Sequence, residues 1–472
     1  MDILGILDRI NGVLWGTPSL ILLFGTGLLL TVMLRGLQFR KLFYAFKLAF
    51  TKEGQSSSKD EGDVSNFKAL MTALAGTIGN GNIAGVATAI TLGGPGAIFW
   101  MWIVGLLGMA TKYAEALLAM KYRVKNANGE YSSGPMYYVE RGLGKKFKWL
   151  AIAFAIFGAF AALGIGNSVQ SNTIADVMET SFGVSNIVTG VLLAGLAALI
   201  IFGGLQRISA VAGFFVPIMA VFYIAGAMLI LLVNFDQIIP AFQTIFYYAF
   251  NPVAAAGGFV GVVVSEAIRN GVARGIFSNE AGLGTAALIA GNAKTDHPVK
   301  QALVAMTGTF IVTIIVCTMT GLVLVISGFW DPTGGQISGI AHDAVGLDGG
   351  ALTSAAFASV LGVVGEYIVA FSIIFFGFST IVGWYVYGEK CFEYIAGSKG
   401  ISGYRAVYIL ACGMGAVANL TTVWAFADMA NALMMIPNLI ALILLSKVVV
   451  RETNDYFTNH YKAASVDMKK AS

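Results

Sequence analysis

Long apolar blocks recur along almost the whole of this 472-residue chain, and they constrain its fold more than any other feature. A stretch of about 20 apolar residues crosses the hydrocarbon core of a bilayer as a helix. Only 11% of the residues are charged, whereas a soluble domain carries about 25%. The sequence therefore predicts an all-α integral membrane protein embedded in a lipid bilayer, and the net charge of +4 does not indicate a nucleic-acid partner.

The apolar blocks divide into eleven expected membrane spans. The first block ends at Arg35, and its N-terminal flank lacks the positive region of a signal peptide, so we interpret it as a retained helix. The expected spans are 13–33, 69–91, 97–120, 149–175, 186–204, 208–234, 258–291, 302–327, 360–388, 404–420 and 423–446.

Basic residues are distributed unevenly between the two sets of connecting segments. If alternate segments and the C-terminus are cytoplasmic, those segments contain 26 of the 29 Lys and Arg residues when Lys112 and Arg405 of the adjoining spans are counted with them. Lys and Arg in short loops stay on the cytoplasmic side during insertion. We therefore expect a multi-pass protein of the cytoplasmic membrane, with its N-terminus outside and its C-terminus in the cytoplasm.

The spans after the first form two sets of five, and the leading span of each set is interrupted by glycine and polar residues. An odd number of helices per set implies that the second set is inserted upside down, as in inverted-repeat secondary transporters. The expected division is an N-terminal extra helix, a cytoplasmic loop, a first five-helix repeat, an external loop, a second inverted repeat and a cytoplasmic tail. Their bounds are 1–36, 37–68, 69–235, 236–257, 258–446 and 447–472.

The first interrupted span contains the segment Ala75–Gly85, which reads AGTIGNGNIAG. Each glycine costs a helix interior about 1 kcal/mol relative to alanine. Unwound backbone at membrane depth is tolerated where it lines a cavity buried in protein. The alternative is that the glycines allow close helix packing, but packing does not require Asn80 and Asn82.

The second interrupted span contains Gly275–Gly284, which reads GIFSNEAGLG. A carboxylate within a membrane span costs about 2.5–3.5 kcal/mol on insertion scales, so Glu280 is expected to face a polar partner or cavity. It could hold a cation, meet a substrate ammonium or carry a proton. The alternative is a structural ion pair with Arg274 or Arg269, or a bond to a nearby asparagine.

Two further spans carry polar side chains. In the fourth, Asn167, Gln170 and Ser171 share one helical face, which suits either ligand contact or hydrogen bonding between helices. In the ninth, Ser379 and Thr380 offer hydroxyl oxygens to a hard cation, although such hydroxyls commonly bond to their own helix.

The paired motifs Gly76–Gly85 and Phe277–Gly284, with Ser132–Tyr137 after the third span, resemble the alanine or glycine:cation symporter family, also called sodium:alanine symporters. The resemblance covers essentially the whole chain. It implies a LeuT-type fold with one additional N-terminal helix before the five-plus-five core. It also implies uptake of alanine or glycine coupled to sodium or, in some members, to protons.

The resemblance further implies roles for individual residues. The position of Glu280 departs from the wider fold, which commonly has a small hydroxyl residue there. Main-chain amides of Asn80 and Gly81 would meet the substrate carboxylate, and Trp384 would limit the side-chain end of the pocket. The full substrate set is Thr77, Gly79, Asn80, Gly81, Gln170, Phe277, Ser278, Asn279, Glu280 and Trp384. The sodium set is Ala75, Ile78, Phe376, Ser379 and Thr380.

Three other functions remain open from the sequence. A passive channel would need a continuous polar pore, but the polar residues concentrate in a few segments. An intramembrane enzyme would need a nucleophile–base pair or metal ligands, and the three histidines fall in expected loops or the tail. A proton-driven carrier of another small solute is the closest alternative because Glu280 could carry the proton. We expect no catalytic residue, no cofactor besides the coupling ion and no obligatory protein partner.

Overall fold

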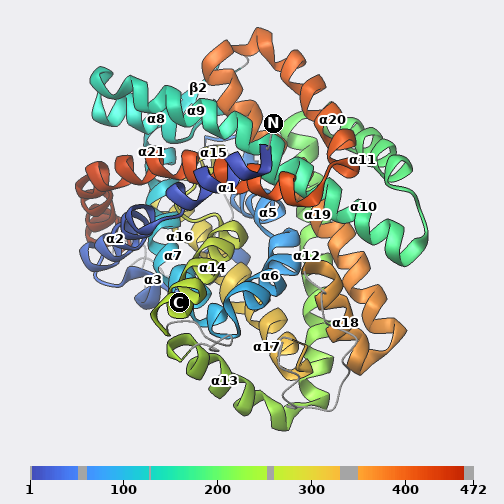
Figure 1. Cartoon of the computed structure of the whole chain (residues 1–472). Helices are drawn as coiled ribbons and strands as arrows, with labels where there is room; N and C mark the ends of the chain where they lie inside the picture. Colours follow the sequence, from blue (N-terminus) through green and yellow to red (C-terminus); the bar gives the residue numbers. More distant parts are fainter. Residues whose placement is uncertain (1–2, 52–60, 127–128, 252–259, 330–348, 462–472) are drawn as a thin grey trace.

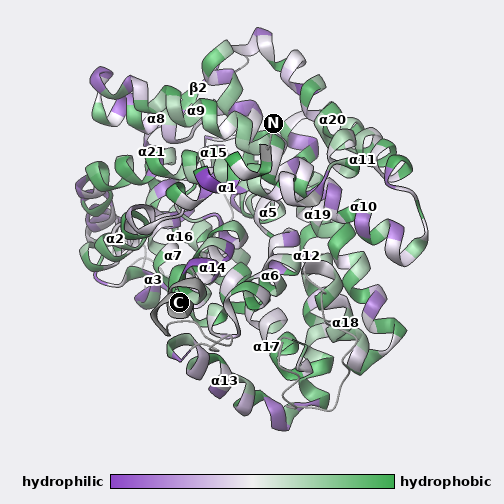
Figure 2. Cartoon of the chain, viewed as in Figure 1, coloured by the Kyte–Doolittle hydropathy of each residue, from purple (hydrophilic) through white to green (hydrophobic). Residues whose placement is uncertain are grey.

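The structure is a computed structural model, and it describes residues 3–51, 61–126, 129–251, 260–329 and 349–461. Parts of several predicted segments lie outside the described residues, among them 252–257 of the external loop, His342, and the tail beyond Tyr461. The described chain is almost entirely helical, and its helices are apolar along most of their length (Figure 2).

The first half of the chain contains thirteen α-helices among the described residues, with a break between α5 and α6. The helices are α1 (Ile3–Leu14), α2 (Thr17–Met33), α3 (Leu37–Arg40), α4 (Leu42–Phe50), α5 (Asn66–Thr77), α6 (Ala84–Gly93), α7 (Gly96–Tyr122), α8 (Pro135–Tyr138), α9 (Lys148–Leu163), α10 (Val169–Phe182), α11 (Asn186–Ile201), α12 (Gly204–Val233) and α13 (Ile238–Phe250).

The second half begins with another broken helix. Its helices are α14 (Val260–Asn279), α15 (Thr285–Ala290), α16 (Pro298–Thr309), α17 (Thr318–Ser327), α18 (Gly349–Leu361), α19 (Val363–Ala396), α20 (Ile401–Val417) and α21 (Leu420–Asp455). In Figure 1, α5, α6 and α14 lie near the centre, and α21 crosses beside α1.

Within the described residues, six helices are long and apolar enough to cross a membrane, and the bent pair α1–α2 makes a seventh candidate. These seven coincide with seven of the predicted spans. The other four predicted spans fall on the two broken helices and on α11 and α20, which have 16 and 17 residues. The prediction of an all-α membrane protein is confirmed, whereas the count of eleven spans stays a prediction.

Two predicted loops contain helices. The segment 37–68, expected to be a cytoplasmic loop, includes α3 and α4, and the expected external loop 236–257 includes α13. In α13 a buried face at Ala241, Ile245 and Ala249 packs inward. An apolar block too short to span a membrane can still form a helix when one of its faces is buried.

Two pairs of short strands connect segments that lie between the helices. The parallel pair β1 (Val64–Ser65) and β4 (Ala293–Lys294) connects the chain before α5 to the chain after α15. The antiparallel pair β2 (Val124–Lys125) and β3 (Tyr131–Ser132) forms a hairpin after α7. The pair β1–β4 thereby ties the start of the first broken helix to the end of the second.

Two of the histidines, one from an expected loop and one from the tail, lie side by side in the structure. The rings of His297 and His460 lie 4.9 Å apart, and Asp455 brings a carboxylate close enough for all three to contact one metal ion. They meet because a π-helical extension of α21 returns beside the start of α16. However, Nδ1 of His297 already accepts the N–H of Val299 at 3.2 Å.

Candidate substrate and sodium site

The first broken helix unwinds between α5 and α6. Ile78 has ψ 85° and Gly79 is extended at φ −126° and ψ −164°, so neither continues the helix. A short 3₁₀ turn at Asn80–Asn82 follows. The side-chain amide of Asn82 donates to the carbonyls of Thr77 at 2.9 Å and Gly79 at 3.3 Å. This side chain replaces the lost helical hydrogen bonds and fixes the shape of the break.

The second broken helix unwinds directly after Asn279. Glu280, Gly282 and Gly284 have φ of 58°, 91° and 80°. Glycine adopts such angles freely, but a non-glycine residue there is strained and is often part of a functional site. In the described chain only Arg35 and Glu280 are non-glycine residues with positive φ.

The two breaks contact each other. The hydroxyl of Ser278 donates to Oδ1 of Asn82, and the hydroxyl of Thr320 donates to the Asn82 carbonyl at 2.9 Å. The ring of Phe277 lies so close to Gly81 that a Cβ there would stand 2.6 Å from it. Residues 196 positions apart thus build one buried polar centre.

Gln170 joins this centre from α10, as the sequence led us to expect. Its Oε1 accepts the main-chain N–H of Asn80 at 3.2 Å, while its Nε2 donates to the Ile165 carbonyl at 3.0 Å. Both polar atoms of the Asn80 side chain are buried without a hydrogen-bond partner among the described residues. A buried amide of this kind is costly unless something polar satisfies it.

The five predicted sodium ligands lie together. The Thr380 hydroxyl stands 3.1 Å from the Ala75 carbonyl oxygen, 3.5 Å from that of Ile78 and 2.9 Å from that of Phe376. The Ser379 hydroxyl lies 3.4 Å from the Ala75 oxygen and 2.9 Å from the Phe376 oxygen. A hard cation prefers such an all-oxygen environment, so the residues fit sodium.

Trp384 lies beside Glu280, with its side chain 1% exposed. Its indole N–H is 2.7 Å from Oε1 of Glu280 and 3.2 Å from the Gly76 carbonyl. The other carboxylate oxygen accepts the hydroxyl of Thr285 at 2.7 Å. The alternative that Glu280 pairs with Arg274 does not hold, because Arg274 pairs with Asp428 at 2.9 Å.

Sequence reasoning missed the side chains that support the second break. Glu115 on α7 accepts the N–H groups of Gly282 and Gly284 at 3.0 Å each, through Oε1. The same oxygen accepts the amide of Asn438 at 2.8 Å. Lys112, also on α7, donates to the carbonyl of Asn279 at 2.9 Å. Both charged residues fall inside the predicted span 97–120, and their position within an apolar helix was the available signal.

The side chain of Asn279 bonds to groups outside the first broken helix. Its amide donates to Thr313 at 3.0 Å, and its oxygen accepts the N–H of Ala281 at 2.9 Å. It therefore stabilises the break from within α14 and its neighbour.

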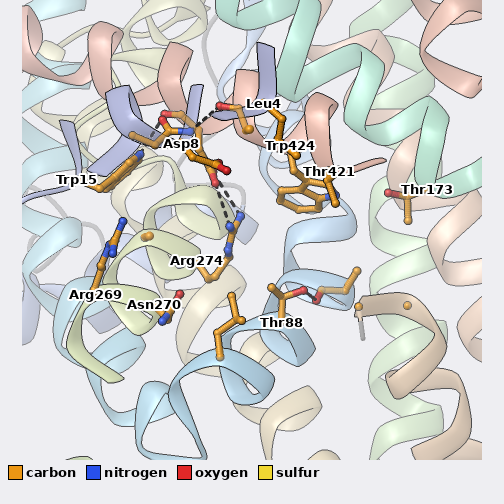
Figure 3. Close-up of a pocket in the computed structure, with 18 of the residues that line it drawn as sticks. Leu4, Asp8, Trp15, Thr88, Thr173, Arg269, Asn270, Arg274, Thr421 and Trp424 are labelled. Atoms are coloured by element: carbon orange, nitrogen blue, oxygen red, sulfur yellow. Dashed lines mark hydrogen bonds and ion pairs between the residues drawn. The ribbon is translucent and has the colours of Figure 1, made fainter. Parts of the chain in front are cut away.

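A cavity of about 680 Å³ opens on the α6 side of the breaks (Figure 3). Its lining includes Arg274, Thr88 and Thr173, but none of the ten predicted substrate residues. Trp424 also lines it, and the ring of Phe277 packs against Trp424 with centroids 4.8 Å apart. The polar centre is therefore closed off from the cavity by aromatic side chains.

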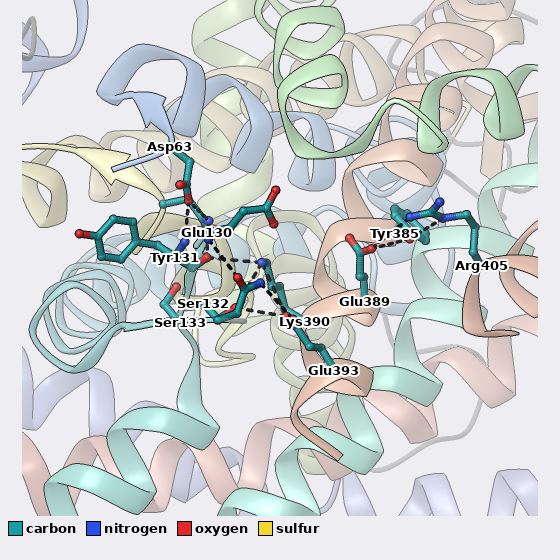
Figure 4. A network of polar contacts seen from close by, with 12 residues as sticks. Asp63, Glu130, Tyr131, Ser132, Ser133, Tyr385, Glu389, Lys390, Glu393 and Arg405 are labelled. Atoms are coloured by element: carbon teal, nitrogen blue, oxygen red, sulfur yellow. Dashed lines mark hydrogen bonds and ion pairs between the residues drawn. The ribbon is translucent and has the colours of Figure 1, made fainter. Parts of the chain in front are cut away.

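A polar network covers the opposite side (Figure 4). Asp63 accepts the side chain of Asn292 at 2.7 Å and the main chain of Tyr131 at 3.0 Å. Lys390 of α19 lies 3.8 Å from Glu393 and donates to Ser132 at 3.3 Å. The network links the start of α5, the segment after α15 and the end of α19.

Two facing broken helices within an all-α membrane fold define a membrane transporter of the LeuT type. The model of the sodium:alanine symporter family matches residues 2–470, and the chain belongs to this family. The sodium/alanine symporter AgcS of Methanococcus maripaludis is 52% identical over 458 residues, which are 97% of this chain and 98% of AgcS. The amino-acid carrier protein AlsT of Bacillus subtilis is 36% identical, over 92% of this chain and 88% of AlsT.

Among solved structures, the crystal structure of MhsT in complex with L-phenylalanine has the same fold. The TM-score is 0.57 at 14% sequence identity, with 82% of this chain and 89% of MhsT covered. At this identity the likeness supports the fold and says nothing of which residues bind substrate.

Proposed function

We propose that this chain couples uptake of alanine or glycine to a sodium gradient by alternating access. The observation that carries the proposal is the convergence of five oxygen atoms from α5 and α19 directly beside the unwound Gly79–Asn80 segment. The relative AgcS, at 52% identity, is a sodium/alanine symporter, which supports both the ion and the substrate.

The substrate would bind where the two breaks meet. The main-chain amides of Asn80 and Gly81 would face its carboxylate, with Gln170 exchanging its bond to Asn80 for one to the substrate. The unpartnered amide of Asn80 supplies further polar atoms in the same place. The ring of Phe277 packs so closely against Gly81 that a Cβ on residue 81 would stand 2.6 Å from it. We infer that this ring also limits the space for the substrate side chain, which favours small amino acids.

The remaining predicted substrate residues would contribute main-chain carbonyl groups or would position the two broken helices. Carbonyl groups of Thr77, Phe277 and Ser278 would accept the ammonium, and the extended Gly79 lets Thr380 approach the break. Glu280 and Trp384 would hold the two broken helices in register, and Asn279 would stabilise the second break.

Sodium would couple to the substrate because it joins α19 to the same unwound carbonyls that shape the amino-acid site. Each ligand would raise the affinity of the other by an equal factor, typically about 5–150-fold. A tenfold sodium gradient supplies about 1.4 kcal/mol per ion, and a membrane potential adds about 2.3 kcal/mol per charge per 100 mV. Together these would concentrate a zwitterion by about a few hundredfold.

We propose that the cavity of Figure 3 faces outside and the network of Figure 4 faces the cytoplasm, in a multi-pass protein of the cell membrane with its N-terminus outside. The closing pair on the outer side is Arg274 with Asp428. The first repeat would be 69–235 and the second 258–446. A leading segment 1–68 would precede the first repeat, a connection 236–257 would join the two, and a tail 447–472 would follow.

The test is uptake of radiolabelled alanine into proteoliposomes with and without an inward sodium gradient. Uphill accumulation that collapses when sodium is equilibrated, and that unlabelled glycine competes away, is the expected result. Accumulation driven by a proton gradient alone would favour the second candidate, a proton-coupled carrier, for which the observation is the buried carboxylate of Glu280. Rapid equilibration with no accumulation under either gradient would instead indicate a passive pore.

A further inference from the structure

The N-terminal helix pair α1–α2 lies outside the five-plus-five core, yet it forms part of the wall of the outer cavity. Leu4, Asp8, Asn11 and Trp15 all line that cavity. The pair bends by 45° between its two helices, so that α1 runs along the outer end of α21 (Figure 1). A helix that served only as a membrane anchor would not need to contribute polar side chains to this wall.

Two side chains of this pair bond to the backbone of α21. The amide of Asn11 donates to the carbonyl of Ala425 at 2.8 Å, and the indole of Trp15 donates to the carbonyl of Asp428 at 3.1 Å. The two carbonyls lie one helical turn apart on α21. Trp15 is only 5% exposed, so its contact is protected from solvent.

Asp428 is the residue through which α21 closes on the second broken helix. Its carboxylate meets the guanidinium of Arg274 at 2.9 and 3.3 Å. The same guanidinium lies 4.8 Å from the centre of the Trp424 ring, and Trp424 packs on Phe277. Asp428 is thus held twice. Its main-chain carbonyl accepts the indole of Trp15, and its carboxylate binds Arg274 between the cavity and the polar centre.

The other helix of the pair touches the second break itself. Leu23 of α2 lies 3.1 Å from the place where a Cβ on Gly282 would stand. Leu23 is buried, together with Leu30 on the same helix. The pair α1–α2 therefore contacts both partners of the outer closure, α21 through hydrogen bonds and the chain after α14 through packing.

We propose that Asn11 and Trp15 are positioning residues that hold the outer end of α21 so that Asp428 meets Arg274 and closes the path from the outer cavity to the polar centre. The extra N-terminal helix then sets the equilibrium between the open and closed forms of this path, and it does so without touching the amino acid. This inference rests on the proposed alternating-access function. A hydrogen bond contributes about 1 kcal/mol net, so its loss should shift that equilibrium about fivefold.

The experiment uses the full chain with the native Cys317 as the reporter, because its Sγ lies 3.0 Å from the Ser278 hydroxyl and 3.4 Å from Oδ1 of Asn82 in the polar centre. Cys391 and Cys412 are replaced by Ala, so a membrane-impermeant thiol reagent reacts with Cys317 alone when the closure opens. Labelling rates are measured in sodium, with the reagent applied to right-side-out and inside-out vesicles. We expect Trp15→Phe, which keeps a ring but removes the N–H, to raise the rate about threefold to tenfold.

Asp428→Asn should raise the rate to a similar extent, and the double variant should label no faster than Asp428→Asn alone, because both changes act through one closure. The matched control is Trp100→Phe, which also removes an indole hydrogen bond to a main-chain carbonyl, that of Ala249 at 3.2 Å, but leaves α21 untouched. Its labelling rate should equal that of the parent.

The outcomes separate this inference from the proposed function. A rate that Asp428→Asn leaves unchanged would refute the closure by Arg274 and Asp428, and with it the outer gate. If Asp428→Asn speeds labelling but Trp15→Phe does not, the closure stands and the positioning role is overturned. Effects that multiply in the double variant would overturn it as well, since Trp15 would then act independently of Asp428. A lowered Tm without faster labelling would assign Trp15 to folding alone.

Discussion

The indole N–H of Trp384 lies 2.7 Å from Oε1 of Glu280, and the same N–H is 3.2 Å from the carbonyl of Gly76. Gly76 belongs to α5, Glu280 follows α14 and Trp384 lies on α19. One donor thus reaches both broken helices from the helix that also supplies the two hydroxyls of the sodium cluster. Glu280 accepts this bond while its own backbone is in the left-handed region, at φ 58°, a conformation that favours glycine.

Replacing Trp384 with Phe should lower the maximal rate of sodium-driven alanine uptake at least about tenfold, because the broken helices lose their shared donor. The measurement is initial uptake in proteoliposomes at saturating sodium and alanine. Trp149→Phe serves as control, since that side chain is 64% exposed. Parent-like rates for Trp384→Phe would show that the link is dispensable.

Glu280→Gln should also impair coupled uptake, because Thr285 and Trp384 donate to different carboxylate oxygens and an amide keeps only one acceptor oxygen. An amide also removes the negative charge that a cation or a proton could neutralise. Sodium-gradient and proton-gradient uptake are measured side by side. Coupled uptake equal to that of the parent with both ions would exclude Glu280 from the mechanism.

Thr380→Val and Ser379→Ala each remove one hydroxyl from the sodium cluster. We expect the sodium concentration for half-maximal uptake to rise about tenfold or more, since a lost ligand to a charged species costs about 1.5–3 kcal/mol. Alanine affinity at saturating sodium should change much less. Ser372→Ala is the matched control, because Ser372 bonds only to Ile368 of its own helix among the described contacts. A sodium dependence unaltered by both changes would place the ion elsewhere.

Gly166→Ala should destabilise the protein and slow transport. A Cβ at Gly166 would stand 2.0 Å from the Cβ of Trp384, so the π-helical turn Gly164–Ser168 before α10 could not keep its present separation from α19. Overpacking of this kind typically costs about 1–3 kcal/mol. The check is the Tm in detergent, compared with Gly195→Ala, where nothing lies within 4 Å. Equal Tm values for the two variants would contradict the close approach.

The orientation is testable with single cysteines at two exposed positions, Glu179→Cys and Lys146→Cys. In intact cells an impermeant thiol reagent should label the first, and it should label the second only after permeabilisation. The reason is that 26 of the 29 basic residues, counting Lys112 and Arg405 of the adjoining spans, are assigned to the side predicted to be cytoplasmic. The reverse pattern would invert the topology and exchange the outer and inner sides.

Local chemistry was sufficient to predict where the two helices are interrupted. The glycine-rich segments at Gly76–Gly85 and Gly275–Gly284 disfavour continuous helix, and both are broken in the structure. Ser379 and Thr380 stood out as hydroxyls in an apolar span, and the resemblance to sodium:alanine symporters paired them with Ala75 and Ile78. The placement of these groups near one another follows the LeuT-type fold that the family shares.

The sequence by itself determined that the chain is a helical membrane protein with two interrupted helices, because the apolar length and the helix-breaking composition are local properties. Only the tertiary structure decided what those interruptions contact. Glu115 caps the second break, Arg274 turns to Asp428 instead of Glu280, and Trp15 reaches α21 across 413 positions. Such pairings depend on how helices pack in three dimensions, and no spacing along one helix encodes them.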